Sequence, residues 1–268
     1  MESIINHLQA VRDESPIVHN ITNYVVMNNT ANALLAIGAS PIMAHAHPEL
    51  QDMVKISGAT VINIGTLDEY WVESMDIATK AANEFGKPWI LDPVGAGASA
   101  YRNETITKLL KHSPTIIRGN ASEIMSMAKV NAVTKGVDST NTSDEALEAG
   151  IALSKKTRAV VCISGEKDYV ILEDRVTAIE NGHPLMGRIT GMGCTATALI
   201  GAFAAIVKDP FHATVSAMCV LGIAGEMAAE KSSGPGSLQL HIYDALSQIS
   251  DTDITNLAKL SSLSNNDL

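Results

Sequence analysis

Short β-branched segments alternate with longer segments of helical pattern through the first two-thirds of the chain, and this alternation constrains the fold more than any other feature. Five short segments are expected to be buried strands: 16–20, 60–64, 88–92, 115–118 and 159–164. Repeated strand–helix–strand units build a mostly parallel sheet with helices on both faces, which is an α/β fold. Two further segments, 169–172 and 175–179, are close enough to pair as an antiparallel hairpin at the sheet edge.

After Gly193 the pattern becomes helical. Apolar residues at helical spacing predict helices over 194–207 and 210–231, and a third helix after the SSGPGS segment with Ser237 as its N-cap. The segment 135–144, KGVDSTNTSD, is typical of a loop within a domain. No long linker interrupts the chain, so we expect a single domain over residues 1–268.

Charge and composition exclude several classes of protein. Acidic residues outnumber basic ones 29 to 19, whereas a nucleic-acid-binding surface usually shows a basic stripe. The three cysteines lack the spacing of a zinc site or a disulfide framework. The N-terminus lacks the apolar core of a signal peptide, and the longest uncharged apolar stretch, 194–207, is too short to span a bilayer. We expect a cytoplasmic protein with no nucleic-acid or membrane partner.

Polar or glycine residues follow each of the five expected parallel strands. Ligands of open parallel sheets bind outside the carboxyl ends of the strands, so these residues are candidates for a site, although turns use the same residue types. Asp92 and Glu123 are the candidate metal ligands, because hard divalent cations prefer carboxylate oxygens; helix capping is the alternative for both. The candidates are Asn20, Asn63, Gly65, Thr66, Asp92, Arg118, Gly119, Asn120, Glu123, Ser164, Gly165 and Glu166.

The segment TGMGCTA, residues 190–196, joins a polar loop to an apolar helix and is the strongest local signal. Gly191 and Gly193 let the backbone approach a ligand, and the first N–H groups of the helix, Cys194 included, would form an anion hole. The segment is neither a Walker A loop nor a complete dinucleotide-binding fingerprint. Cys194 lies where a helix terminus favours a thiolate, and the alternative is a small side chain packed under the loop.

Two histidines in the segment SPIMAHAHPEL, His45 and His47, are two residues apart. A metal site there would need a third ligand that the sequence does not locate. The preferred interpretation is that this segment forms the wall of a pocket, with Met43 supplying an adaptable apolar contact.

Taken together, these motifs resemble those of the hydroxyethylthiazole kinase family. The resemblance covers the chain from about Asn20 to Gly236, and its most specific parts are the DPVGAG motif, RGNASE and the glycine–cysteine loop. It is carried by NITNYVVMNNTANALLAIGASPIMAHA, INIGTL, ILDPVGAGAS, IIRGNASEI, a GVD segment near Gly136, CISGE, NGHPL, ITGMGCTATALIGAF and GPGS.

The resemblance implies a ribokinase-like three-layer sandwich and an ATP- and Mg²⁺-dependent transfer of phosphate to the hydroxyl of 4-methyl-5-(2-hydroxyethyl)thiazole. It implies a homotrimer whose pockets lie between subunits. The implied roles are as follows: Met43, Gly191 and Asn23 contact the thiazole; Arg118 and Ser164 bind the nucleotide; Gly191, Gly193 and Cys194 form the anion hole; and Cys194 is the catalytic residue.

Several alternatives stay open. Within the same fold, the chain could phosphorylate another small alcohol of the pyridoxal or hydroxymethylpyrimidine type, or act as an ATP-dependent nicotinamide-nucleotide-hydrate dehydratase. Outside kinase chemistry, Cys194 could be the nucleophile of a hydrolase, which would also need a histidine partner. A nucleotide sensor that binds ATP without phosphorylating an alcohol is a further alternative.

A carboxylate at position 194 tests the role of the cysteine. Ribokinase-like sugar kinases mostly carry an aspartate base where this sequence has Cys194, and phosphoryl transfer depends more on positioning and charge neutralisation than on base strength. Cys194→Asp is therefore expected to retain or raise kcat in a steady-state kinase assay. A loss of several orders of magnitude would contradict this prediction.

Overall fold

The computed structural model describes residues 1–130 and 142–263, and within these residues nine strands form one sheet in the order β2-β1-β3-β4-β5-β6-β7-β8-β9. The strands β1 to β6 are mutually parallel, and β7, β8 and β9 continue the sheet in antiparallel pairing. Their bounds are β1 Ile17–Ile21, β2 Ser40–Ile42, β3 Ala59–Asn63, β4 Trp89–Asp92, β5 Ile116–Asn120, β6 Val160–Ser164, β7 Asp168–Leu172, β8 Arg175–Ile179 and β9 Leu260–Leu263.

This topology confirms the expected parallel sheet and the β7–β8 hairpin, but two strands were missed. β2 has three residues, one of them Pro41, and among the described strands it pairs with β1 alone. β9, LSSL, carries two serines and pairs with β8, so the hairpin is not the edge of the sheet. Neither segment has the β-branched run by which the other strands were found.

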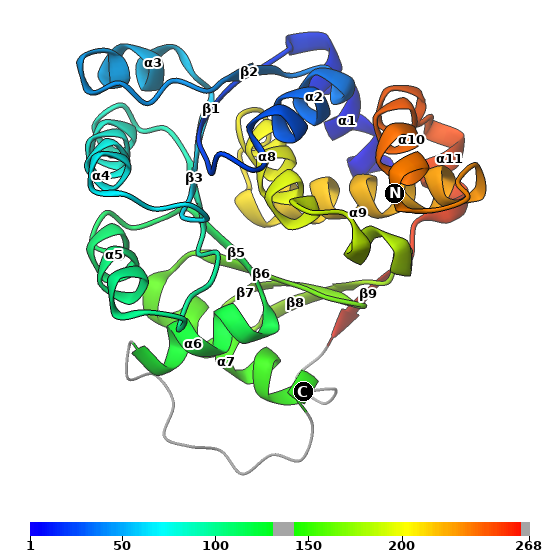
Figure 1. Cartoon of the computed structure of the whole chain (residues 1–268). Coiled ribbons are helices and arrows are strands. Elements are labelled where there is room, and N and C mark those ends of the chain that lie inside the picture. Colours follow the sequence, from blue (N-terminus) through cyan, green and yellow to red (C-terminus); the bar gives the residue numbers. More distant parts are fainter. Residues whose placement is uncertain (131–141, 264–268) are drawn as a thin grey trace.

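Helices cover both faces of the sheet, as Figure 1 shows, which gives the expected three layers. One face is covered by α3 Leu50–Ile56, α4 Glu69–Glu84, α5 Ala100–Leu110, α6 Ala121–Val130 and α7 Thr142–Thr157. The other is covered by α1 Glu2–Glu14, α2 Met27–Ile37, α8 Met192–Ala204, α9 Pro210–Glu230, α10 Pro235–Gln248 and α11 Asp251–Leu257. Two short 3₁₀ helices, η1 His47–Glu49 and η2 Pro184–Arg188, complete the elements of the described part.

The alternation of side chains along the strands builds two separate cores. Ile90 of β4 belongs to the cluster on the α8 side of the sheet, whereas its neighbour Leu91 belongs to the cluster on the α4 side. Strands buried on both faces are expected of a parallel sheet between two helical layers, and they explain the continuous apolar runs of the sequence.

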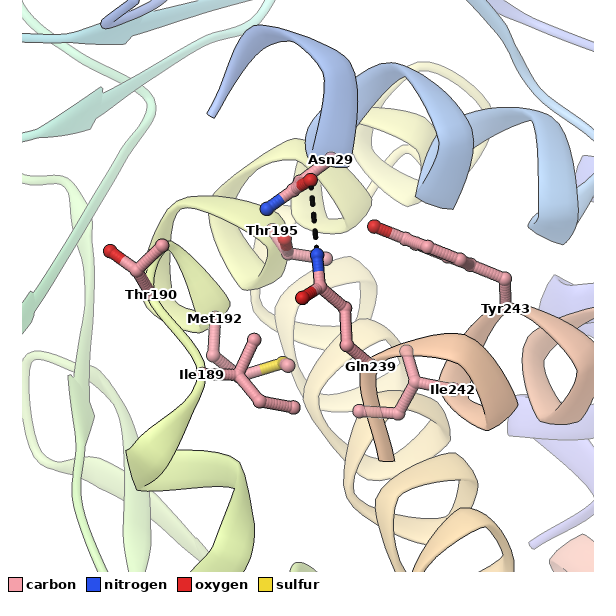
Figure 2. A pocket seen from close by; sticks show the side chains of 8 residues that line it. All are labelled: Asn29, Ile189, Thr190, Met192, Thr195, Gln239, Ile242 and Tyr243. Carbon is pink, nitrogen blue, oxygen red and sulfur yellow. Dashed lines mark hydrogen bonds between the residues drawn. The ribbon is translucent and has the colours of Figure 1, made fainter. Parts of the chain in front are cut away.

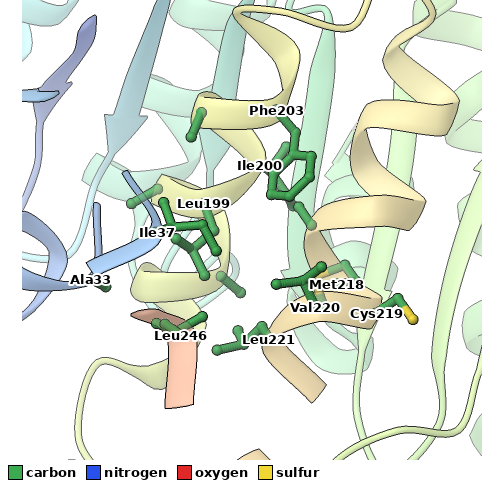
Figure 3. Close-up of a cluster of buried hydrophobic side chains, with 14 of the residues drawn as sticks. Ala33, Ile37, Leu199, Ile200, Phe203, Met218, Cys219, Val220, Leu221 and Leu246 are labelled. Atoms are coloured by element: carbon green, nitrogen blue, oxygen red, sulfur yellow. The ribbon is translucent and has the colours of Figure 1, made fainter. Parts of the chain in front are cut away.

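Helix α8, which begins at the predicted anion loop, is the most enclosed helix of its layer. Every residue from Thr195 to Ala204 is buried, and Figure 3 shows Leu199, Ile200 and Phe203 packed among side chains of α2, α9 and α10. Gly201 lets the helix approach the sheet, because a Cβ there would lie 2.8 Å from Val61 Cγ2 and 2.9 Å from Val18 Cγ1. This packing holds the helix start at the strand ends.

Helix α9 has the length and composition of a membrane-spanning helix, which the sequence reasoning had overlooked. In the structure, however, 83% of its apolar window is buried inside the protein. It is packed as a core helix against α8 and α10.

Two expected boundaries need correction, at the start of the third helix and at the end of the 135–144 loop, and a further expectation falls outside the described residues. The third helix, α10, begins at Pro235 with Gly234 as N-cap, and Ser237, its third residue, accepts a bond from the Gly234 N–H (3.2 Å) instead of being the cap. Residues 142–144, expected in a loop, are the start of α7. The rest of that expected loop and the GVD segment lie outside the described residues.

The close approach of α8 to the sheet predicts a stability effect. Gly201→Ala is expected to lower the free energy of unfolding by about 1–2 kcal/mol, because overpacking outweighs the better helix propensity of alanine. Gly236→Ala in α10 is the matched control, since a Cβ there meets nothing within 4 Å, and it should be neutral or stabilising. Urea unfolding measures both, and a Gly201→Ala protein as stable as wild type would contradict the packing argument.

Candidate active site

The polar residues that follow the parallel strands do meet at the carboxyl ends of these strands, as the sequence predicted. Strand register places Asn63 of β3 beside Asp92 of β4, and Asn120 of β5 beside Ser164 of β6. The start of α8 lies at the same strand ends, since Thr197 and Cys194 contact residues of this group. Segments far apart in sequence therefore form one polar cluster above an apolar core.

A chain of hydrogen bonds joins four of these side chains. Asn23 Nδ2 donates to Asn63 Oδ1 at 2.8 Å, and Asn63 Nδ2 donates to Asp92 Oδ2 at 2.7 Å. Thr197 Oγ1 donates to the same Asp92 oxygen at 2.8 Å. Gly65 is required beside this chain, because a Cβ there would lie 2.5 Å from Asn23 Nδ2. The end of β1, two neighbouring strands and α8 are thereby locked together.

Asp92 is fully buried at the centre of this chain. Burial raises the pKa of its carboxyl group to about 6, although the nearby Arg118 charge and the bond from Thr197 oppose the shift. Within the described part of the molecule its second oxygen, Oδ1, has no hydrogen-bond partner. A buried carboxylate oxygen without a partner is an unsatisfied acceptor, and it marks a position that a ligand or cation would satisfy.

Cys194 is the third residue of α8, at the helix end where it was expected, but its protonation state was predicted wrongly. Asn23 Nδ2 lies 3.5 Å from Cys194 Sγ. Burial, followed by the nearby Asp92 charge, raises the pKa of the thiol to about 11, and bonds from Asn63 and Asn23 only partly offset this. The group is a neutral thiol at neutral pH, because desolvation disfavours the thiolate.

The loop before α8 has the backbone shape of an anion hole. Gly191 is the N-cap with a φ of 78°, and a Cβ there would collide with Val26. The first bond within the helix runs from the Thr195 N–H to the Gly191 carbonyl at 2.8 Å. The N–H groups of Met192, Gly193 and Cys194 precede it and have no acceptor within the helix, so they are available to an anion.

Arg118 supplies positive charge beside this loop. Its guanidinium lies so close to Gly193 that a Cβ there would collide with it, and Nη2 donates to Ser164 Oγ. The side chain is 8% exposed, and Nε has no partner among the described residues. Arg118 therefore bridges the anion hole and the end of β6. It brings Ser164, expected to bind the nucleotide, close to Gly193 of the expected anion hole.

Asp168, which the sequence reasoning did not single out, lies near Arg118. Its Oδ1 accepts a bond from the Gly165 N–H at 2.9 Å, and burial raises its pKa to about 6 despite this bond and the Arg118 charge. Asp168 shapes the turn after Ser164. Its position in the GEKD turn was the only signal, and turns commonly use aspartate.

Glu123 has the capping role that the sequence left open. Its Oε2 accepts from the Asn120 N–H at 2.8 Å, and Asn120 Oδ1 accepts from the Glu123 N–H at 2.9 Å, which is a reciprocal cap at the start of α6. Its other oxygen accepts from the Gly95 N–H at 2.9 Å and holds the loop that follows Asp92. The described residues contain no group of three or more His, Cys, Asp or Glu side chains that could hold a metal unaided.

The segment after β2 contains stacked aromatic rings. His45 packs against Trp71 with ring centroids 4.1 Å apart, and His47 stacks on Tyr70 at 3.9 Å. Met43 is half-buried at the start of this segment. These ring contacts hold the segment against α4, and its role as the wall of a pocket stays a prediction.

Residues that sequence reasoning missed hold the site in shape. Arg102 of α5 donates to the Val94 and Gly65 carbonyls, both at 2.7 Å, and so ties the loop after β4 to the end of β3. Thr197 and Trp71 were also missed, because each lies inside a helix and only the tertiary fold brings it to the site.

A small cavity lies behind the anion loop, between α2, α8 and α10 (Figure 2). Its volume is about 10 Å³, which is about the space of one water molecule. Gln239 Nε2 donates to Asn29 Oδ1 across it at 3.2 Å. This cavity is too small for a substrate.

Residues 8–252 match the model of the hydroxyethylthiazole kinase family. The chain belongs to this family. It is 57% identical over 250 residues to the hydroxyethylthiazole kinase of Leptospira biflexa, covering 93% of this chain and 94% of the relative.

Solved structures agree with the family assignment. The hydroxyethylthiazole kinase structure from Pyrococcus horikoshii OT3 has a TM-score of 0.93 and 44% identity, covering 98% of this chain and all of that one. A ribokinase-like superfamily protein from Enterococcus faecalis has a TM-score of 0.62 at 13% identity, covering 86% of each chain, and shows the shared fold. The fold is therefore ribokinase-like, as expected. As a member of the hydroxyethylthiazole kinase family, the chain is a phosphotransferase with ATP as co-substrate.

The buried carboxylate predicts a pH-dependent stability. Because the pKa of Asp92 is raised in the folded state, the folded protein binds more protons than the unfolded chain between about pH 4 and 6, and stability falls as pH rises through this window. Asp92→Asn removes this fall in stability, because asparagine does not titrate. The free energy of unfolding of the variant minus that of wild type should increase by about 1 kcal/mol from pH 5 to pH 7.5. The variant should also lose phosphoryl transfer.

Unfolding by urea at several pH values measures this difference. Asp168 titrates in the same range but is present in both proteins, so its contribution cancels. Parallel pH profiles for the two proteins would contradict the assignment of a buried, unfavourable charge to Asp92.

Proposed function

We propose that this chain transfers the γ-phosphoryl group of ATP to the hydroxyl of 4-methyl-5-(2-hydroxyethyl)thiazole, in thiamine biosynthesis or salvage. One observation supports this above the others: the anion loop of α8, Arg118 and buried Asp92 meet at the strand ends of a hydroxyethylthiazole kinase family chain. Phosphoryl transfer needs mainly positioning and charge stabilisation, and these groups supply both.

The residues divide between nucleotide and acceptor. Arg118 and Ser164 bind the nucleotide phosphates, and the N–H groups from Gly191 to Cys194, including that of Gly193, face the transferred phosphoryl group. Asn23, Met43 and Gly191 line the acceptor pocket. A small, uncharged ring suits an apolar lining with few polar anchors.

In the transfer step, the acceptor oxygen forms a bond to the γ-phosphorus while the bond from that phosphorus to the bridging oxygen of ADP breaks. Cys194 orients the acceptor hydroxyl as a hydrogen-bonding thiol, because a group with a pKa of about 11 is already protonated at neutral pH. The hydroxyl proton leaves to the phosphoryl oxygens as the new ester forms. Asp92 and Arg118 set the charge around these atoms.

Mg²⁺ fits the residues present. Asp92 Oδ1, which is buried and has no partner among the described residues, is a suitable oxygen ligand, and Glu123 completes an acidic pair near the loop that follows β4. When bound, the ion would neutralise charge on the phosphates. Magnesium typically keeps several waters and substrate oxygens as ligands, which agrees with a site that holds only a few protein ligands.

We also propose one kinase domain, located in the cytoplasm and assembled as a homotrimer with the acceptor pocket between subunits. Exposed apolar side chains next to Asn23 support the assembly: Tyr24 is 59% exposed and Val25 60%. Three free cysteines agree with a reducing compartment.

An ADP-release assay with Mg·ATP, with and without hydroxyethylthiazole, tests the proposed reaction, and mass spectrometry identifies the phosphate ester. Thiazole-dependent turnover that exceeds turnover with pyridoxal or hydroxymethylpyrimidine is expected. No stimulation by thiazole, with ATP binding intact, would contradict the proposal and favour the other small-alcohol kinases or the dehydratase. Complete loss of an ATP-independent hydrolysis on alkylation would identify a cysteine hydrolase instead.

Ser164 at the end of β6 and Ser154 of α7 give a matched comparison in the same assay. Ser164→Ala is expected to raise the KM for ATP about threefold to tenfold, since it removes the partner of Arg118. Ser154→Ala, which removes a bond to the Ala159 carbonyl before the strand, should leave the KM unchanged. Equal effects of the two variants would contradict the placement of the nucleotide.

A further inference from the structure

Trp71 lies on α4, outside the residues assigned to substrate, yet it contacts both segments of the acceptor pocket. The side chain is 2% exposed, and its indole Nε1 donates to the Thr22 carbonyl oxygen at 3.0 Å. Thr22 directly precedes Asn23, which binds Asn63 and Cys194. This indole bond therefore fixes the backbone from which Asn23 reaches the reacting groups.

The indole ring of Trp71 also packs against the second segment. Its centroid lies 4.1 Å from that of His45 and 4.8 Å from that of Tyr24, with interplanar angles of 34° and 44°. His45 Nδ1 in turn lies 3.3 Å from the Met43 carbonyl oxygen and, because a carbonyl only accepts, must be the donor. Trp71 is thus one contact away from Met43 as well as from Asn23.

The segment that carries Met43 depends on such contacts. It follows β2, an edge strand of three residues that, in the part of the chain the structure describes, pairs with β1 alone. Beyond the strand, Ser74 Oγ of α4 donates to the His45 carbonyl at 2.7 Å, and His19 Nε2 of β1 donates to the Ala44 carbonyl at 2.7 Å. With so little sheet pairing, the position of this segment depends on its contacts with β1 and α4, and the Trp71 ring is one of them.

We propose that Trp71 is a positioning residue that fixes the segment of Asn23 and the segment of Met43 relative to each other. It thereby sets the affinity for the acceptor alcohol. This role rests on the proposed function, in which Asn23 and Met43 line that pocket. Trp71 acts through Thr22 and His45, so its loss changes binding of the acceptor more than binding of ATP.

The chain provides a matched control, because it has only two tryptophans and both are buried indole donors. Trp89 donates to the His112 carbonyl at 3.1 Å, at the opposite end of the sheet. Trp71→Phe and Trp89→Phe therefore remove the same atoms from two buried positions, and any loss of stability is shared. Only the first change is next to the site.

Steady-state kinetics with hydroxyethylthiazole distinguish the two variants. Trp71→Phe is expected to raise the KM for the thiazole about threefold to tenfold, the effect of losing one net hydrogen bond, with the KM for ATP unchanged. Trp89→Phe should match wild type in both constants. His45→Ala, which removes the ring contact from the half-buried segment, should reproduce the thiazole effect if Trp71→Phe does not fold.

Fluorescence gives a readout that a merely structural role would not move. Trp89→Phe leaves Trp71 as the single tryptophan, and titration with thiazole in the absence of ATP is expected to change its emission. The same titration of Trp71→Phe, which retains only Trp89, should show no change. Equal thiazole KM values for the two tryptophan variants, or no emission change from Trp71 at saturating thiazole, would overturn the positioning role. Absence of turnover in wild type would instead contradict the proposed function and this role with it.

Discussion

A buried carboxylate at the end of β4 is the constraint on which the rest of the site depends. Asp92 is fully enclosed, and burial raises its pKa to about 6, so a charge there at neutral pH carries the penalty of burial. Asn63 and Thr197 partly offset this penalty by bonding one oxygen. The other oxygen has no hydrogen-bond partner within the described residues, so it is available as an acceptor at the strand ends. The fold tolerates this because two apolar clusters, one on each face of the sheet, supply stability elsewhere.

The chain has ten excess negative charges, so its attraction for a polyphosphate must come from positive groups at the site and not from the net charge. One arginine and the open N–H groups of α8 face the same region, and burial around them weakens screening by water. Gly193 is essential to this arrangement, since the Arg118 guanidinium occupies the space that any larger side chain would need. Packing of α8 on the sheet through Gly201 then fixes where the positive region lies relative to Asp92.

The sequence predicted the parallel sheet and the convergence of strand-end residues because both follow from local periodicity and from the geometry of parallel strands. It predicted the wrong protonation state for Cys194, because the effect of a helix terminus is visible in a short segment, whereas burial and the charge of Asp92 come from the tertiary fold. Trp71 and Thr197 were missed for the same reason. β2 was missed because its three residues carry no pattern and depend on pairing with β1.

A double-mutant cycle tests most directly whether the strand-end groups act as one unit. Asn23 and Thr197 are the two ends of the chain of bonds that passes through Asn63 and Asp92. The measurement is kcat/KM for thiazole phosphorylation in Asn23→Ala, Thr197→Val and the double variant. If the chain acts as a unit, the double variant should lose less than the product of the two single losses, by a factor of about ten. Effects that multiply to within about twofold would show that the two ends act independently and would contradict a unit centred on Asp92.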